Sequence, residues 1–175
     1  RCHDLVPLPD GFRPLYIDVY GADQLQRFAA VWINDGTRPA RLTRTNYEPD
    51  RFAQEHDSLV SQGYLPRIVT AYPGSGRKTW YLGHWIRESG QFQCKLGITQ
   101  QQFAKDLQEM EGQWRPAWVN AYIFDGKFRK YNAVWQPDDG SIDWQYSVAI
   151  PLSQFEKDLE IHTAHGYRPV VWDVE

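Results

Sequence analysis

One pair of residues has the spacing of a known catalytic nucleophile. Ser75 and Lys78 match the Ser-x-x-Lys pattern, in which a lysine assists attack by a serine. That chemistry needs both side chains on one helical turn. Here the pair lies between Tyr72 and Tyr81, in a stretch whose glycines indicate a turn joining two strands. A turn is therefore the favoured interpretation, and the sequence predicts no catalytic residue.

Two histidines have a spacing that suits metal binding. His162 and His165 are three residues apart, so on a helix they could supply two ligands. Aligned segments elsewhere in the chain carry Leu59 and Met110 at the position of His162, which indicates a core-facing position. No third ligand with sensible spacing accompanies the pair. We therefore expect no metal and no other cofactor.

A third group of residues suggests binding. Small polar side chains stand two residues before tyrosines along segments with strand-like alternation, an arrangement that suits a sugar or an extended peptide. The alternative is structural, with the same groups joining one strand to the next by hydrogen bonds. The candidate ligand-binding residues are Asp18, Tyr20, Thr70, Tyr72, Asn120, Tyr122 and Asp173.

Composition narrows the class of protein. The chain has 175 residues, of which 42% are hydrophobic and 23% charged, the balance of an ordinary globular domain. Aromatic residues reach 15%, which favours sheet surfaces and broad contact faces. The net charge of −3 gives no basic footprint for nucleic acid. No run of about 18 apolar residues exists, so no membrane span is predicted.

The first residue is Arg1, not methionine, which indicates a processed or excised chain. The cysteines are Cys2 and Cys94. They permit one disulfide, which would fit an oxidising compartment, but a free Cys2 and a core Cys94 are equally compatible with the sequence.

Internal repetition is the strongest signal in the chain. A Gly-aromatic-Arg-Pro motif recurs with variations, and its prolines are 52, 50 and 53 residues apart. A tyrosine follows six residues after each of the first three prolines, a tryptophan after 18 or 19, and a phenylalanine some 20 residues later. These landmarks are Pro14, Pro66, Pro116 and Pro169; Tyr20, Tyr72 and Tyr122; Trp32, Trp85 and Trp135; and Phe52, Phe103 and Phe155.

The periodicity within one copy changes along its length. Period-two alternation after each proline predicts strands, and Asp-Gly pairs at 35–36 and 139–140 predict hairpins that lead to a third strand, most clearly Trp144–Ile150. Apolar residues at helical spacing follow, as in Phe103, Leu107 and Met110. Capping-box spacings begin at Thr99 and Ser153.

We therefore predict an α+β fold of three β-β-β-α repeats of about fifty residues, with pseudo-threefold symmetry. The whole of 1–175 forms one domain with units 11–62, 63–113 and 114–165 and a terminal strand at 166–175. That strand either closes the array or marks a cut in a longer one.

At the Gly-aromatic-Arg-Pro motifs, the hairpin tryptophans and the segment Leu152–Phe155, the chain resembles the bacterial tandem-repeat domain family. This family also occurs in the N-terminal half of fungal polyglycine hydrolases. The resemblance covers nearly all of the chain from Gly11. It implies substrate or surface binding beside a separate serine-hydrolase domain similar to β-lactamases, which this chain is too short to contain.

The expected function is a secreted, non-catalytic module that binds a glycan or peptide through several equivalent weak sites. Three alternatives stay open. The chain could be the accessory domain of a secreted serine hydrolase, an enzyme with an active site in one diverged copy, or a spacer that docks a neighbouring catalytic domain.

Overall fold

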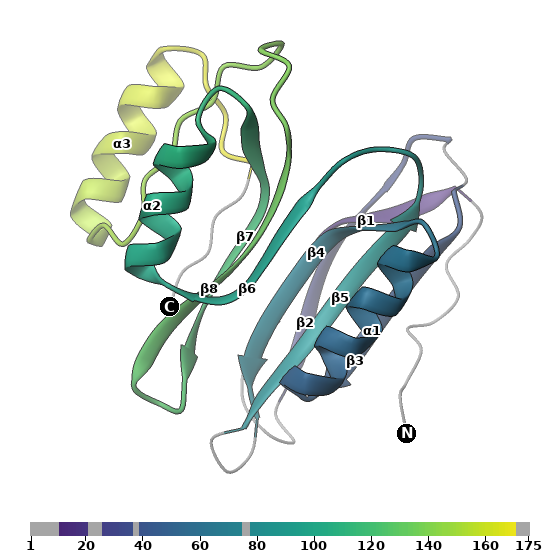
Figure 1. Cartoon of the computed structure of the whole chain (residues 1–175). Helices are drawn as coiled ribbons and strands as arrows, with labels where there is room; N and C mark the ends of the chain where they lie inside the picture. Colours follow the sequence, from purple (N-terminus) through teal and green to yellow (C-terminus); the bar gives the residue numbers. More distant parts are fainter. Residues whose placement is uncertain (1–10, 21–25, 37–38, 75–77, 171–175) are drawn as a thin grey trace.

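The computed structural model describes residues 11–20, 26–36, 39–74 and 78–170. Within them the chain forms eight strands and three helices (Figure 1). These are β1 (Phe12–Tyr20), β2 (Arg27–Asn34), β3 (Arg41–Tyr47), α1 (Pro49–Ser61), β4 (Tyr64–Pro73), β5 (Thr79–Arg87), β6 (Gln93–Thr99), α2 (Gln100–Met110), β7 (Trp114–Phe124), β8 (Phe128–Pro137) and α3 (Leu152–Ala164).

The three hairpins share one register, as the repeat predicts. Each periodic proline lies opposite its tryptophan, and a bulge follows directly after it on the first strand. The pairs are Pro14 with Trp32, Pro66 with Trp85, and Pro116 with Trp135. The α+β repeat is therefore present in the structure as well as in the spacing of the landmarks.

The grouping of strands into sheets differs from the expected order. β1 pairs with β2, β5 lies between β3 and β4, and β8 lies between β6 and β7, all antiparallel. The strand expected to end one unit thus joins the hairpin of the next. Because only Glu48 separates β3 from α1, the helix must lie on the sheet that β3 joins. The unit in space is strand, helix, strand, strand.

The predicted Asp-Gly hairpins at Gly36 and Gly140 are wrong for the same reason. Both glycines have positive φ, 74° and 70°, but they begin connections that leave the hairpin. The Asp-Gly hairpin turn lies at Asp125-Gly126, between β7 and β8, with φ of 52° and 63°. Lys127 N–H donates to the Phe124 carbonyl at 3.1 Å, so Asp125 and Gly126 are the central residues of this turn, and positive φ at both is what a type I′ turn requires.

The predicted strand Trp144–Ile150 is not formed. Its residues pair with no strand in the described part of the chain, and Trp144 Nε1 donates to Asp138 Oδ2 at 2.8 Å. By analogy with β3 and β6, this segment needs the second strand of a following hairpin. Of the expected terminal strand at 166–175, the described residues 166–170 form no strand and Val170 is exposed, whereas residues 171–175 lie outside the described residues.

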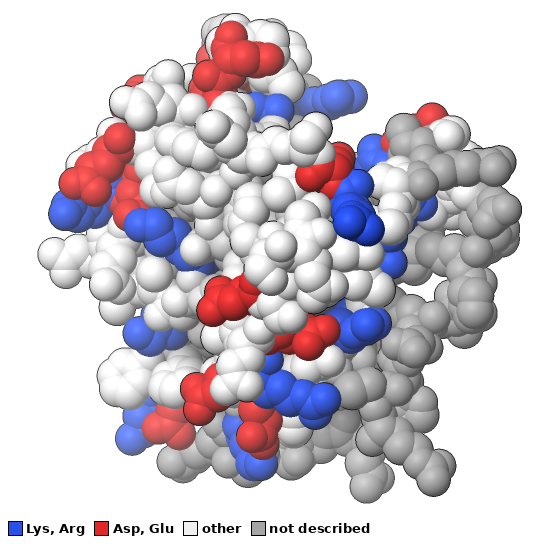
Figure 2. Space-filling view, turned by 45° about the vertical axis from the view of Figure 1, so that its right-hand side comes forward, with Lys and Arg blue, Asp and Glu red and all other residues white. Residues whose placement is uncertain are grey.

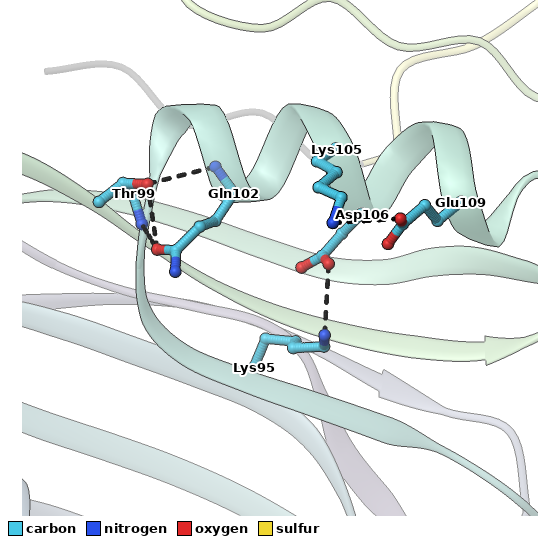
Figure 3. A network of polar contacts seen from close by, with 6 residues as sticks. All are labelled: Lys95, Thr99, Gln102, Lys105, Asp106 and Glu109. Atoms are coloured by element: carbon cyan, nitrogen blue, oxygen red, sulfur yellow. Dashed lines mark hydrogen bonds and ion pairs between the residues drawn. The ribbon is translucent and has the colours of Figure 1, made fainter.

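The helices follow their sequence signals closely at two of three starts. α1 begins at Pro49, and α2 has the predicted capping box, with Gln102 N–H donating to Thr99 Oγ1 at 3.2 Å and Thr99 N–H donating to Gln102 Oε1 at 2.8 Å (Figure 3). In α3 the cap is Pro151, so the expected box at Ser153 is wrong.

Each complete unit buries its tryptophan beneath its helix. Phe52 of α1 stacks on Tyr81 at 4.8 Å and lies 5.5 Å from Trp85, measured between ring centroids. In the next unit, Phe103 stacks on Tyr131 at 5.1 Å and contacts Trp135 at 6.0 Å, and both tryptophans are fully buried. The periodic tryptophans and phenylalanines of these units are therefore core residues.

Gly83 provides a first test of this packing. A Cβ at Gly83 would lie 2.0 Å from Trp85 Cη2, and the buried Trp85 ring also donates from Nε1 to His56 at 3.3 Å. We expect Gly83→Ala to lower the free energy of unfolding by about 2 kcal/mol, because overpacking displaces a ring that has no free space. Urea denaturation measures the change.

The matched control is Ala133→Gly, since Ala133 occupies the position of Gly83 in β8. There the cost should be about 1 kcal/mol, from lost backbone restriction and a lost methyl group. A Gly83→Ala protein as stable as the parent would contradict the packing described for Trp85.

Candidate functional site

The predicted polar and tyrosine residues come together at the junctions between sheets. The first strands of the three hairpins supply one shared core, which contains Ile17 of β1, Val69 of β4, and Trp118 of β7. Trp118 Nε1 donates to the Val69 carbonyl at 3.1 Å, and its ring lies 5.5 Å from that of Tyr16. β1, β4 and β7 are therefore the strands along which the repeats meet.

Asn120 is the centre of the polar contacts between β4 and β7. Its Oδ1 accepts from Ala71 N–H at 2.7 Å and from Asn132 Nδ2 at 3.1 Å. Asn132 Oδ1 in turn accepts from Gly97 N–H at 3.0 Å. One side chain thus connects the sheet of β4 to that of β7, and Asn132 carries the connection on to β6.

Thr70 and Asp18 stand at the equivalent positions, and their hydrogen bonds differ from those of Asn120. Thr70 Oγ1 donates to the Ile17 carbonyl at 3.5 Å, which joins β4 to β1. Asp18 is half-buried, and its Oδ1 accepts from Val19 N–H at 2.7 Å. The hydrogen bond between sheets is therefore short at Asn120 and long at Thr70, whereas the bond described for Asp18 stays within β1.

The predicted tyrosines form a second layer of the same junctions. Tyr72 donates to Asn46 Oδ1 at 2.8 Å and accepts from Asn46 N–H at 3.0 Å. Tyr122 and Tyr81 share a hydroxyl–hydroxyl hydrogen bond of 2.9 Å. Burial raises the pKa of Tyr72 to about 12 and raises the pKa of Tyr81 and Tyr122, so these phenols stay neutral at physiological pH.

Four of the predicted ligand-binding side chains present no surface for a ligand in this conformation. Thr70 and Tyr72 are 2% and 1% exposed, and Asn120 and Tyr122 are each 5% exposed. Their geometry corresponds to the structural alternative, in which the hallmark residues hydrogen-bond one strand to the next. The side chain of Tyr20 and the whole of Asp173 lie outside the described residues.

The sequence analysis missed two residues of the junction, Asn132 and Asn46. Asn132 aligns with Ala29 and Leu82, so no repeated polar position signals its role. Asn46 has a φ of 60°, and Gly97 in the next unit has 61°. An asparagine and a glycine at the same point of successive copies are both tolerant of positive φ, which is the signal that could have located this bulge.

An open groove lies beside the start of α1. It has a volume of about 730 Å³ and is lined by residues in and directly before α1 and β5 and by the end of β7: Glu48, Pro49, Asp50, Arg51, Gln54, Lys78, Thr79 and Phe124. Lys78 Nζ lies 2.8 Å from Glu48 Oε1 and 5.8 Å from the Trp80 ring centroid. Phe124 is 41% exposed. A groove of this size combines a charged pair with an aromatic face, features common to ligand sites.

The other chemical candidates are not supported by geometry. Lys78 forms the ion pair just described, whereas Ser75 lies outside the described residues. His56 accepts from Trp85 Nε1, and burial lowers its pKa. Among the described residues, no group of three His, Cys, Asp or Glu side chains could hold a metal.

Cys94 is half-buried, and burial raises the pKa of its thiol to about 12. Cys2 lies outside the described residues, so a Cys2–Cys94 disulfide and its alternative, a free Cys2 beside a core Cys94, both stay predictions. No helix within the described residues has the length and apolar character to cross a membrane. On the face shown in Figure 2, charges of both signs are interspersed.

Comparison with known proteins agrees with the repeat. A family model described as a polyglycine hydrolase-like structural repeat matches residues 8–35, 38–88, 89–138 and 141–174. The second and third matches each span one strand-helix-strand-strand unit, β3 to β5 and β6 to β8. No curated protein matches the chain. The chain belongs to the polyglycine hydrolase-like structural repeat family.

Proposed function

We propose that this chain is a non-catalytic repeat module that binds an extended peptide in the groove beside α1. The observation that carries this proposal is the role of the hallmark residues. Thr70, Tyr72, Asn120 and Tyr122 serve junctions between sheets, so the repeated positions support a rigid framework and not a reaction centre. Binding then falls to the exposed groove, whose residues are not repeated.

The chemistry of the groove supports a backbone ligand. The family description names polyglycine hydrolases. A glycine-rich peptide, as a ligand, presents mainly its backbone N–H and C=O groups to the protein. Lys78, Glu48 and Thr79 supply donors and acceptors, and Phe124 supplies an apolar face. A glycan, the other ligand class expected from the sequence, would use the same groups through its hydroxyls.

The wider proposal concerns the parent protein. We place the module outside the cell, as one domain over 1–175 with approximate threefold symmetry, beside a hydrolase domain to which it presents substrate. The family description supports the association with a hydrolase, and the shared core of β1, β4 and β7 supports a single domain. One groove per chain replaces the several equivalent sites expected at the hallmark positions.

Phe124→Ala tests the groove. Its ring is 41% exposed and lines the groove, so its loss should weaken the binding of an oligoglycine peptide about tenfold, equivalent to about 1.4 kcal/mol. Titration followed by amide chemical shifts measures the affinity. An oligosaccharide titrated in parallel distinguishes the two ligand classes.

The matched control is Phe128→Ala, because Phe128 pairs with Phe124 in the same hairpin but does not line the groove. It should leave the affinity unchanged. Equal losses in the two variants, or saturable binding of neither ligand by the parent chain, would rule the groove out.

A further inference from the structure

A small pocket opens where the sheet of β4 meets the sheet of β8. It has a volume of about 230 Å³ and shares no lining residue with the groove beside α1. Its walls are the start of β4, the end of β8 and the connection from β5 to β6, which runs from one sheet to the other (Figure 1). The lining includes three polar side chains, Arg67, Glu88 and Gln136, and three apolar ones, Leu65, Pro66 and Phe92.

The start of β4 differs from the equivalent segments of β1 and β7. Arg67 directly follows the periodic proline, at the position where β1 has Leu15 and β7 has Ala117. Leu65 directly precedes that proline, where both other hairpins have an arginine. The arginine of this hairpin has therefore moved by two residues, to a position that only this copy uses for a charge.

The ion pair of the hairpin has moved with it. In the first hairpin Arg13 Nε lies 2.6 Å from Asp35 Oδ2. Glu88 stands at the position of Asp35, directly after the second strand, and it forms its ion pair with Arg67. Since Arg67 and Glu88 both line the pocket, this pair places a guanidinium and a carboxylate side by side on its wall.

Gln136 adds an amide from the end of β8. Its carbonyl oxygen accepts from Arg115 Nη1 at 2.7 Å in the amide orientation that satisfies its hydrogen bonds. The amide nitrogen then lies on the side of Arg67, whose Nη1 is 3.5 Å away. The pocket thus offers N–H donors from Arg67 and Gln136 next to the acceptor oxygens of Glu88.

This combination selects a neutral ligand that donates and accepts at neighbouring atoms. A ligand of either charge would be repelled by one member of the ion pair. A hydroxyl both donates and accepts, so two hydroxyls on adjacent ring carbons can donate to Glu88 and accept from Arg67. A planar trans peptide group directs its N–H and its C=O to opposite sides, so one amide cannot bond to both groups of the pair.

We propose that this pocket binds one neutral sugar ring of a glycan. The ring hydroxyls bond to Arg67, Glu88 and Gln136, and its C–H face lies against the apolar wall of Leu65, Pro66 and Phe92. The site is separate from the peptide groove and does not depend on it. Because its walls belong to two sheets, a bound sugar also connects β4 to β8 and should stabilise the folded chain.

Cellotetraose and β-mannotetraose are suitable probes, because the first has only equatorial ring hydroxyls and the second has an axial one on each ring. In a titration of the full chain followed by amide chemical shifts, at least one of them should cause saturable changes at Arg67 and along 88–92. Pentaglycine should leave these amides unchanged. Failure of both sugars, or equal changes with pentaglycine, would overturn the proposal, whereas failure of pentaglycine to bind anywhere would count only against the groove.

Arg67→Leu introduces the residue that β1 has at this position. It should weaken sugar binding by at least about tenfold, because a charge-assisted hydrogen bond is lost. Glu88→Gln keeps the shape of the side chain and one acceptor oxygen, so its loss of affinity should be smaller. Circular dichroism checks that both variants are folded.

The matched control is Arg44→Leu. Arg44 forms an ion pair with Glu55 away from the pocket, and these side chains are 28% and 31% exposed, close to the 37% and 32% of Arg67 and Glu88. Its removal should leave the sugar affinity unchanged. Unaltered affinity in both Arg67→Leu and Glu88→Gln, or an equal loss in Arg44→Leu, would show that the sugar does not bind through this ion pair.

Discussion

Replacing His84 by valine should remove most of the acid sensitivity of this protein. His84 is 2% exposed on β5, and its Nδ1 lies 2.8 Å from Thr43 Oγ1. Burial, reinforced by the positive charges of Arg41, Arg13 and Arg67, lowers its pKa from 6.5 to about 3. The folded protein therefore holds His84 neutral over a pH range in which the unfolded chain would protonate it.

The sign of the effect follows from this lowered pKa. Above pH 6.5 both states hold a neutral imidazole, and the stability is fully present. As the pH falls below 6.5, the unfolded state binds a proton that the folded state excludes, and stability is lost progressively until the pH reaches about 3. At about pH 4.5 the loss should be about 2–3 kcal/mol, because each pH unit contributes up to about 1.4 kcal/mol.

Urea midpoints at neutral pH and at about pH 4.5 measure the difference. Valine is the natural replacement, since Val134 occupies the same position in β8 and is 2% exposed. His56→Leu, which copies Leu107 of α2, is the comparison: His56 has a lowered pKa as well, so its removal should flatten the profile only in part. An unchanged acid slope in His84→Val would show that other groups control it.

His84 also illustrates what periodicity alone reveals. The landmarks Pro66, Tyr72 and Trp85 have nearly the same spacing as their equivalents in the other copies. This spacing correctly predicted a hairpin of defined register with a helix nearby. His84 carried no such signal, because Val31 and Val134 stand at its position. Features common to all copies could be predicted from the sequence, whereas a chemistry confined to one copy could not.

The sequence could not show which hairpin the third strand of each copy joins, for a related reason. Alternation with period two identifies a strand but not its neighbour, and β3 could pair with β2 or with β5. The choice depends on α1, which follows β3 after one residue and must cover the tryptophan of the sheet that β3 joins. Trp144–Ile150 is the corollary: its own residues specify a bulged strand, yet it forms none without a hairpin beside it.

Burial of the predicted binding residues has a similar explanation. Alternation along β4 suggested that one face of the strand meets the core and the other meets solvent. In the structure β4 lies between β1 and β7, and both of its faces are buried. Thr70 and Asn120 therefore face another sheet instead of water. Small polar residues at such positions are compatible with an open site or with a sealed junction, and only the packing of neighbouring repeats distinguishes them.

Asn120→Ala should be among the most destabilising substitutions in the chain. Removal of Oδ1 leaves the buried Ala71 N–H and the Asn132 amide without their acceptor. A buried group left unsatisfied costs about 1–3 kcal/mol, so the two together should lower the free energy of unfolding by about 3–4 kcal/mol. The Ala71 bond joins β4 to β7, and the Asn132 bond joins β8 to β7 within one sheet. Amide exchange in β7 and β8 should therefore accelerate more than in β1 and β2.

Asp18→Ala is the matched control, since Asp18 holds the equivalent position but is half-buried and bonds only to its own strand in the contact described above. It should cost less than about 1 kcal/mol. Asn120→Thr introduces the residue that β4 has at this position. Its loss of unfolding free energy should lie between those of Asn120→Ala and Asp18→Ala, since a hydroxyl can accept from one of the two donors. Equally mild effects of Asn120→Ala and Asp18→Ala would contradict this role of Asn120, and the contact between β4 and β7 would then depend on apolar packing and on the Trp118 hydrogen bond to the Val69 carbonyl.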